Sequence, residues 1–163
     1  TGAFRHLSVT VGERIRGLYR SADEKGRQRD VLYFFWVKQV ACPHCGHPVD
    51  LFPTRIMARN ANPDRKPEVQ VCCPKCGDIF PARNGDKRVS CGACGLAFNP
   101  HEGSASGAKA NCARCSKQFI IAEAVRATRA PPAHRLYAKL LLLTDGAKHY
   151  LPAMWYVILH TPW

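Results

Sequence analysis

The sequence predicts a small α+β fold, mostly β, that is held together by bound metal ions rather than by a large apolar core. Four Cys-x-x-Cys pairs lie within 163 residues, and the apolar residues around them occur in short runs. Chains with so little core usually need metals or disulfides to offset conformational entropy. Runs of β-branched and aromatic residues, separated by Gly and Pro, predict short strands.

The four pairs have the spacing of metal-binding knuckles: Cys42/Cys45, Cys73/Cys76, Cys91/Cys94 and Cys112/Cys115. Two thiolates three positions apart can bind one ion across a tight turn, and two such knuckles complete the tetrahedral shell of a structural zinc site. Glycine follows three of the pairs, which suits a turn with positive φ. Eight cysteines therefore predict two Zn²⁺ ions in a double zinc ribbon with rubredoxin-like knuckles. Iron is the alternative metal.

The spacing leaves two ways of grouping the pairs. Sequential grouping joins the first pair to the second and the third to the fourth. Nested grouping joins the second to the third, inside a site made by the first and fourth. Residues 71–98 have the length of one complete ribbon, with a turn at Asn84-Gly85 or Gly85-Asp86. We therefore favour an inner site of Cys73, Cys76, Cys91 and Cys94, and an outer site of Cys42, Cys45, Cys112 and Cys115.

Other uses of the cysteines fit the sequence less well. Their total of nine is odd, no secretory signal opens the chain, and the spacing is not that of a disulfide framework. We expect a reducing, cytoplasmic location. Cys72, the ninth cysteine, is expected to be a small buried residue. Because eight cysteines complete two sites, we expect nearby histidines to be polar surface residues: His44, His47 and His101.

The first 30 residues predict a helix and a linker. Apolar residues recur at helical spacing between residues 4 and 20: Phe4, Leu7, Val11, Ile15 and Leu18. The polar residues 21–30 predict an exposed loop or linker. Residues 31–40, rich in β-branched and aromatic side chains, predict a strand that leads into the first knuckle.

The remainder divides into the double ribbon, residues 31–120, and a C-terminal segment, residues 121–163. Within the ribbon, residues 53–67 predict a loop, and the Gly and Ser residues of 103–107 a flexible connector. In the C-terminal segment, a strand at 136–144 and a turn at Asp145-Gly146 predict a β-hairpin that returns over 148–151. The apolar tail, 154–163, is expected to pack against another surface.

The charge favours a polyanionic partner. The formal net charge is +12, and two zinc ions with eight thiolates would leave about +8. No apolar run is long enough to span a bilayer, so no membrane partner is expected. Basic residues available to such a partner lie in two places: Arg55, Arg59, Arg65 and Lys66 between the first two knuckles, and Arg126, Arg129, Arg135 and Lys139 near the end.

Four segments resemble the cysteine-rich insert of bacterial and archaeal adenine-specific DNA methylases: Tyr33–Phe52, Ala58–Pro63, Gly107–Cys115 and Val125–Lys139. The likeness covers about residues 31–153, and the order of the knuckles and of their flanking residues matches. Some relatives lack the inner ribbon but keep counterparts of Cys42/Cys45 and Cys112/Cys115. The resemblance therefore implies that these two pairs close one site.

The catalytic motifs of these enzymes are absent from the sequence. The Asp/Asn-Pro-Pro-Tyr/Phe motif is missing, since Asn62-Pro63 and Asn99-Pro100 lack the second proline and the aromatic residue. A glycine-rich loop that could bind S-adenosylmethionine is also missing. The resemblance implies a non-catalytic segment that contacts DNA through the basic residues named above. It would work with a methyltransferase catalytic domain in the same or a neighbouring chain, and only that parent enzyme would bind S-adenosylmethionine. Because the chain begins without methionine, we expect it to be part of a longer protein.

Two other functions are compatible with the pattern. The main alternative is a free-standing zinc-ribbon module that binds protein or single-stranded nucleic acid, with Tyr33, Phe35 and Trp36 as stacking residues. We expect these aromatic residues to pack behind the ribbons instead. A zinc hydrolase or deaminase needs an open coordination position and a general base. The pair His101-Glu102 lacks the surrounding motif of such an enzyme.

Overall fold

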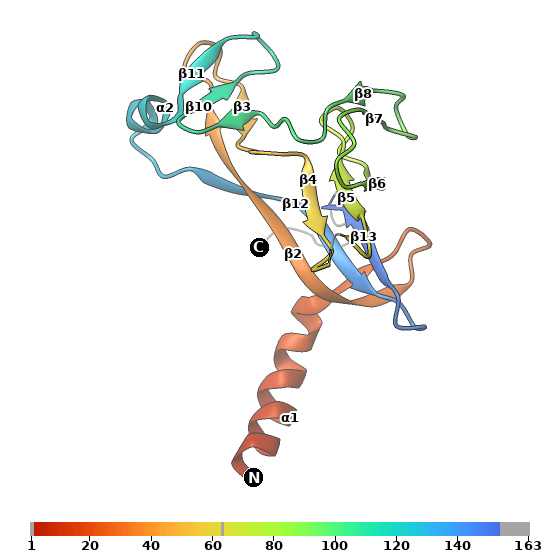
Figure 1. Cartoon of the computed structure of the whole chain (residues 1–163). Helices are drawn as coiled ribbons and strands as arrows, with labels where there is room; N and C mark the ends of the chain where they lie inside the picture. The colour runs from red at the N-terminus through yellow and green to blue at the C-terminus, as the bar shows by residue number, and fades with distance from the viewer. Residues whose placement is uncertain (1, 63, 154–163) are drawn as a thin grey trace. The chain divides into compact units, whose positions relative to one another are not determined.

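The computed structural model describes residues 2–62 and 64–153 (Figure 1). This part is mostly β, with two α-helices and many short strands, so the predicted mostly β class is confirmed at that level. The chain forms two compact units. The described residues of the first unit are 2–34 and 138–153, and those of the second are 35–137. The division differs from the three consecutive segments predicted from the sequence, because the N-terminal and C-terminal segments share one unit.

In the first unit, α1 (Gly2–Arg16) runs into a 3₁₀ turn, η1 (Gly17–Tyr19), and then into β1 (Arg20–Ala22). Strand β1 pairs antiparallel with the beginning of β2 (Gln28–Ala41), with Arg20 opposite Asp30. Residues 21–30 therefore form a β-hairpin and not a linker, although residues 24–28 at its turn are exposed as predicted. The Asp23 carboxylate accepts the backbone N–H groups of Lys25 and Arg27, each at 2.9 Å, and closes a hairpin turn.

The C-terminal part of the same unit is a second antiparallel pair. The last residues of β12 (Ala133–Leu142) pair with β13 (Lys148–Pro152), around a turn that contains Asp145 and Gly146. Val31, Leu141 and Leu151 form the small core of the unit, with Phe34 packed against it. The predicted apolar tail lies outside the described residues. No helix within the described ranges has both the length and the apolar character needed to cross a membrane.

The second unit consists of short strands between the cysteine pairs. The end of β2 pairs with β3 (Pro48–Asp50). A three-stranded sheet follows, in the order β4 (Ile56–Arg59), β5 (Glu68–Cys72) and β6 (Ile79–Arg83), and then a two-stranded pair of β7 (Val89–Ser90) and β8 (Ala97–Phe98). The last sheet contains β9 (Ala105–Ser106), β10 (Lys109–Asn111) and β11 (Gln118–Ile120), with β10 in the centre.

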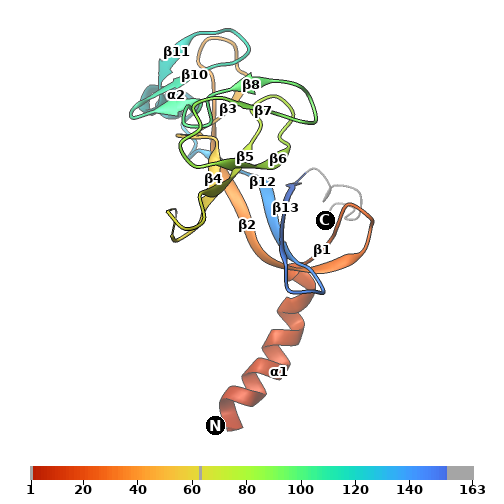
Figure 2. The same ribbon diagram turned by 45° about the vertical axis from the view of Figure 1, so that its right-hand side comes forward.

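Two parts of this unit differ from the sequence prediction. Helix α2 (Ile121–Thr128), which the sequence did not indicate, lies beside β11 (Figures 1 and 2). The supposed flexible connector is an ordered part of the sheet. The Ser104 hydroxyl accepts the N–H of Phe52 at 3.1 Å and donates to the carbonyl of Asp50, and the N–H of Ala105 donates to the Phe52 carbonyl at 2.9 Å.

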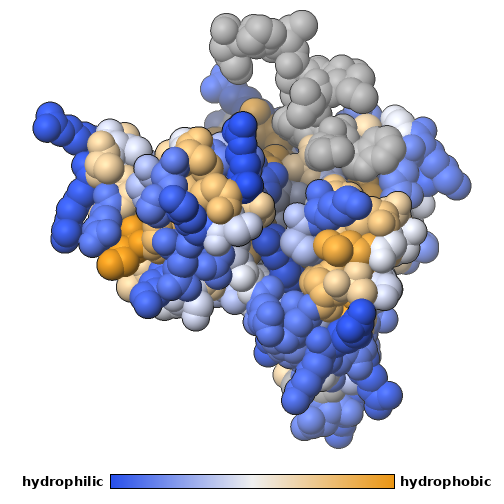
Figure 3. Space-filling view, turned by 90° about the horizontal axis from the view of Figure 1, so that it is seen from above, coloured by the Kyte–Doolittle hydropathy of each residue, from blue (hydrophilic) through white to orange (hydrophobic). Residues whose placement is uncertain are grey.

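The second unit has two separate small cores, one beside each group of cysteines. Val40, Val49, Ala110 and Phe119 pack around Cys42 and Cys112 in the first, whereas the second contains Ile56, Val69, Val71 and Val89. Hydrophilic side chains dominate the face of the molecule in the space-filling view, with small apolar patches between them (Figure 3). Small domains with cores of this size usually need a further source of stability, such as bound metal ions or disulfides.

Candidate metal centres

All four cysteine knuckles have the same backbone hydrogen bonds. The N–H of the first cysteine donates to the carbonyl five residues later, and the N–H four residues later donates back to the carbonyl of that cysteine. These eight bonds are 2.8–3.0 Å long and join Cys42 with Gly46 and His47, Cys73 with Gly77 and Asp78, Cys91 with Gly95 and Leu96, and Cys112 with Ser116 and Lys117. The knuckle is thus a repeated local structure that its own backbone stabilises.

The residue directly after the second cysteine of each pair donates the second of these bonds. To do so, its backbone adopts the left-handed conformation, with positive φ. Gly46, Gly77 and Gly95 take this position with φ of 71°, 75° and 71°. The fourth knuckle has Ser116 there, with φ of 58°. A residue with a Cβ atom is strained in this conformation, so the glycines after the first three pairs have the conformational role expected of them.

The outer site combines the knuckle between β2 and β3 with the knuckle between β10 and β11. The Sγ atoms of Cys42 and Cys115 lie 3.7 Å apart, and those of Cys45 and Cys112 lie 3.6 Å apart. All four sulfurs lie within 4.8 Å of one another. Two segments about 70 residues apart in sequence thus meet at one point.

The inner site has the same geometry. It combines the knuckle after β5 with the knuckle after β7, and its Cys73–Cys94 and Cys76–Cys91 sulfur pairs are each 3.6 Å apart. These four sulfurs also lie within 4.8 Å of one another. The structure therefore has the nested grouping and not the sequential one.

The sulfur separations match a tetrahedral zinc shell. A Zn–S bond of about 2.3 Å places two ligand sulfurs roughly 3.8 Å apart at the tetrahedral angle. The observed 3.6–3.7 Å is close to that value and far from the bond length of about 2.05 Å in a disulfide. The two four-cysteine groups are therefore compatible with two metal ions, and zinc fits their donor set.

The electrostatics of the groups also fit a cation. A backbone N–H from Leu96 lowers the pKa of the Cys94 thiol to about 7, and one from Cys115 lowers that of Cys112 to about 7. The N–H of His47 favours the Cys45 thiolate, yet burial and the neighbouring sulfurs outweigh it and raise the pKa of Cys45 to about 11. Four sulfurs this close cannot all ionise without a positive charge between them.

Both sites are closed. The first cysteine of every pair is at most 2% exposed: Cys42, Cys73, Cys91 and Cys112. Among the described residues, no histidine or carboxylate belongs to either group. Four protein sulfurs leave no open position for water or substrate, which is the arrangement of a structural rather than a catalytic zinc site. This geometry gives no support to hydrolase or deaminase chemistry.

The remaining cysteine and histidines lie outside both groups. Cys72 is 4% exposed, its Sγ faces the carbonyl oxygens of Cys73 and Gly77, and burial raises its pKa to about 11. It is the small buried residue expected from the sequence. His44 and His101 are exposed and His47 is half-buried.

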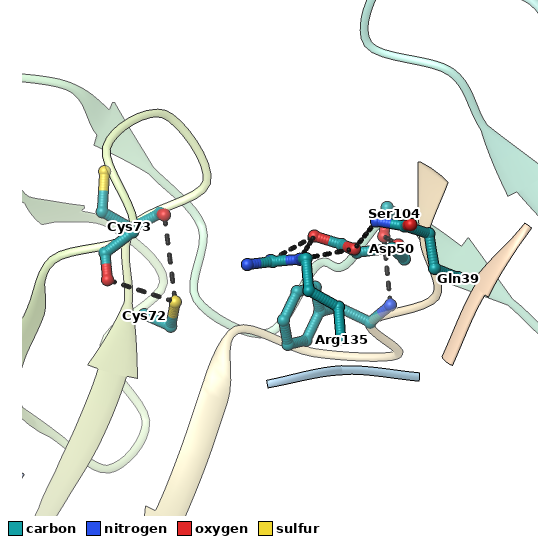
Figure 4. A network of polar contacts seen from close by, with 8 residues as sticks. Gln39, Asp50, Cys72, Cys73, Ser104 and Arg135 are labelled. Atoms are coloured by element: carbon teal, nitrogen blue, oxygen red, sulfur yellow. Dashed lines mark hydrogen bonds and ion pairs between the residues drawn. The ribbon is translucent and has the colours of Figure 1, made fainter. Parts of the chain in front are cut away.

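The predicted nucleic-acid contacts differ in their exposure. Six of the eight are exposed: Arg59, Arg65, Lys66, Arg126, Arg129 and Arg135. Arg55 is half-buried, with its guanidinium carbon 4.6 Å from the centre of the Phe52 ring. Arg135 is exposed but paired: it contacts Asp50, and the Gln39 amide donates to the same carboxylate at 2.9 Å (Figure 4). This pairing limits what Arg135 can offer a phosphate.

Lys139 does not fit the prediction of a DNA contact. It is fully buried in the first unit, where its Nζ donates to the Ser21 hydroxyl at 2.6 Å and to the Ala22 carbonyl at 2.9 Å. Burial lowers the pKa of its ammonium group, while the nearby Asp23 carboxylate opposes that change. Its position inside a continuous apolar run, residues 136–143, was the signal of burial in the sequence.

Comparisons with protein-family models, with curated proteins and with solved structures find no match to this chain.

Proposed function

We propose that this chain is a double zinc ribbon in which two zinc ions stabilise a DNA-contacting segment of an adenine-specific DNA methyltransferase. The observation that carries the proposal is the pair of closed four-sulfur groups. Each group fits one tetrahedral Zn²⁺ and lacks the open position that catalysis requires. The metals would supply folding free energy, and any chemistry would belong to a separate catalytic domain that binds S-adenosylmethionine.

The charge of the second unit supports contact with a phosphate backbone. Arg59, Arg65 and Lys66 are exposed around the loop between β4 and β5. Lys66 and Arg83 also line a groove of about 640 Å³ together with Asn60 and Glu68. Lysine and arginine contacts with phosphates supply most of the sequence-independent affinity for DNA.

The methyltransferase part of the proposal rests on the resemblance of residues 31–153 to the methylase insert. An enzyme that modifies a base within a duplex must extrude that base, and it therefore needs surfaces that hold the backbone during extrusion. A rigid basic module without catalytic residues suits this task. The genetic test is direct: the proposal requires the methylase motifs to be encoded in the same or an adjoining reading frame.

Binding of duplex DNA over a range of salt concentrations tests the contact. We expect affinity to fall linearly with the logarithm of salt concentration. Combined replacement of Arg59, Arg65 and Lys66 by Ala should reduce the slope by about 1 for each lost phosphate contact. The control removes equal charge elsewhere in the unit, at the exposed Lys109, Arg114 and Lys117.

Two results contradict the proposal. One is an affinity that does not change with salt. The other is an equal loss of affinity and slope in the control variant, which would show that net charge alone acts. Zinc content, measured on every variant, separates lost contacts from lost folding.

A further inference from the structure

A groove in the second unit combines an exposed tryptophan, an aromatic floor and cations. Its volume is about 290 Å³, and its walls include Trp36, Lys38, Phe52, Arg55, Met57 and Tyr137. Trp36 is 58% exposed, although the sequence suggested that it packs behind the ribbons. This exposure leaves the Trp36 ring accessible to a ligand in the groove.

The floor of the groove consists of packed aromatic rings. The Tyr137 ring packs edge-on against Phe52, with ring centres 4.9 Å apart, and lies 6.3 Å from the ring of Phe35. Burial raises the pKa of Tyr137 to about 12, so this ring is neutral. The packed rings of Phe52 and Tyr137 thus give the groove an apolar surface.

Two cations border this surface. Lys38 is exposed and lies two residues after Trp36 on strand β2, so both side chains point to the same face of the strand. The backbone of Arg55 is fixed by hydrogen bonds to Pro100 at 2.8 Å and from Cys72 at 2.9 Å. No hydrogen bond joins its guanidinium to another residue of the described chain. This cation stacks on Phe52 and remains available to an anion.

An aromatic face with cations at its edge is the combination that binds single-stranded nucleic acid. The ring stacks on a base, and the cations neutralise the phosphates on either side of it. A paired base is not accessible to such a groove, because its faces are covered by its neighbours in the duplex. The groove volume suits one heterocyclic ring and its sugar, and the positive net charge of the chain attracts the strand.

We propose that this groove holds one unpaired base of a DNA strand, stacked on Trp36, with Arg55 and Lys38 contacting its flanking phosphates. The inference deepens the proposed function and rests on it. It adds a site for the unpaired strand to the backbone contacts of the β4–β5 loop.

The experiment uses the whole zinc-loaded chain and two probes: a 12-nucleotide thymidine strand and a 12-base-pair duplex. Trp36→Ala should weaken binding of the single strand roughly 5- to 150-fold, the range for loss of one base–aromatic stack. It should leave duplex affinity within about twofold. Trp36→Phe keeps an aromatic face and should recover most of the loss.

Tyr33→Ala is the matched control, since Tyr33 is 63% exposed on the same strand and does not line the groove. Its affinity for the single strand should stay within about twofold of the unmodified chain. A 2-aminopurine placed in the strand gives a second readout: its fluorescence should be quenched by the unmodified chain and not by Trp36→Ala.

The outcomes separate the two proposals. Salt-dependent duplex binding without an effect of Trp36→Ala on the single strand, or with an equal effect of Tyr33→Ala, overturns the groove and leaves the proposed function standing. A chain that binds neither probe overturns both. Two zinc ions retained in each variant exclude loss of folding as the cause.

Discussion

The backbone N–H of Ser116 donates to the carbonyl oxygen of Cys112 at 2.8 Å, and Ser116 adopts a left-handed φ of 58° to make this bond. The corresponding residue of the other three knuckles is glycine. A left-handed conformation costs a residue with a Cβ atom about 1–2 kcal/mol, whereas glycine loses about 0.5–1 kcal/mol through the entropy of the unfolded chain. Ser116→Gly should therefore stabilise the chain by about 0.5–1 kcal/mol.

Urea unfolding with saturating zinc measures this change. The reverse substitution, Gly95→Ala, is the control, because an added Cβ there meets no atom within 4 Å and only the φ of 71° opposes it. It should destabilise by about 1 kcal/mol. If Ser116→Gly destabilises the chain, the serine side chain must stabilise the fold by more than its left-handed backbone conformation costs.

The two metal sites should lose their ions independently. Their sulfurs belong to different groups, and each group has a separate apolar core. Combined Cys73→Ser and Cys91→Ser should therefore remove one zinc, since both ligands serve the inner site. Combined Cys42→Ser and Cys91→Ser should remove both. Sequential grouping requires the loss of both ions in the first variant.

Metal content and circular dichroism check these variants. Cys72→Ala is the control, because this cysteine lies in neither group; it should keep two ions. Chelation of the unmodified chain should abolish most of the second unit, because structural zinc in small modules contributes free energy comparable to the entire folding stability.

Sequence alone identified what depends on local spacing. The knuckles, their glycines and the strand into Cys42 follow from short patterns, because a Cys-x-x-Cys-Gly turn closes with its own backbone. The grouping of the pairs depends on loops of about 15 and 70 residues. Periodicity does not constrain such long-range contacts, and the nested arrangement was favoured by ribbon length and by resemblance.

The role of Gly103 could not be predicted from the spacing of residues in the sequence. A Cβ atom added to it would lie 1.9 Å from the Phe52 carbonyl oxygen, so two backbone segments are in direct contact here. Gly103→Ala should push them apart, break the Ala105–Phe52 hydrogen bond and destabilise the chain by at least about 2 kcal/mol. The composition of residues 103–107 suggested flexibility, whereas this glycine is needed for close approach.

Gly92→Ala is the matched control for this substitution. An added Cβ at Gly92 has no atom within 4 Å, and its φ lies outside the left-handed region. Its effect on stability should stay within about 0.5 kcal/mol. The two variants can be compared by thermal unfolding at saturating zinc; equal stabilities would show that the Phe52 segment moves without cost.

The hairpin of residues 21–30 was not predicted either, because its formation depends on contacts that composition does not show. Asp23 is only 5% exposed and binds two backbone N–H groups as well as the side chains of Arg27 and Arg29. A run of charged residues has the same composition whether it is solvated or folded around one carboxylate. The buried Lys139 belongs to the same unit, and its polar partners come from β1, more than 100 residues earlier.

Asp23 should make the stability of the first unit sensitive to acid. Burial opposes its ionisation, but the Arg27 N–H, the Arg29 side chain, the Lys25 N–H and the Arg27 side chain outweigh burial and hold the pKa of Asp23 well below its usual range. The folded pKa is therefore below the unfolded value of about 3.9. The stability that the charged Asp23 carboxylate contributes to the fold is therefore complete above about pH 4. It is lost as the pH falls toward the pKa of Asp23 in the folded state.

Asp23→Asn tests this dependence. The variant should be less stable than the unmodified chain at pH 7, and the difference should shrink below pH 4. Zinc release at low pH affects both proteins, so the difference between them at each pH is the quantity to measure, by urea unfolding. A difference that stays constant from pH 7 to pH 2.5 would rule out a contribution from the charge of Asp23.

The ion pair between Asp50 and Arg135 should stabilise the second unit modestly. The Arg135 Nε lies 3.0 and 3.1 Å from the two carboxylate oxygens, and the Arg135 side chain keeps 46% of its exposure. Bonds from Arg135 and Gln39 outweigh burial and lower the pKa of Asp50, so the carboxylate is charged at neutral pH. Solvent screening limits the coupling of such a pair to about 1 kcal/mol.

A double-mutant cycle with Asp50→Asn and Arg135→Gln, followed by urea unfolding, measures the coupling. Arg20 and Asp30 are the matched control pair, since they lie 3.8 Å apart and their side chains are 53% and 60% exposed; their coupling should be close to zero. If Arg135 instead serves mainly to bind DNA, its cycle will also give no coupling, and Arg135→Gln will reduce the salt slope of duplex binding. A coupling of about 1 kcal/mol, with an unchanged salt slope of duplex binding, would show that Arg135 stabilises the fold and does not contact DNA.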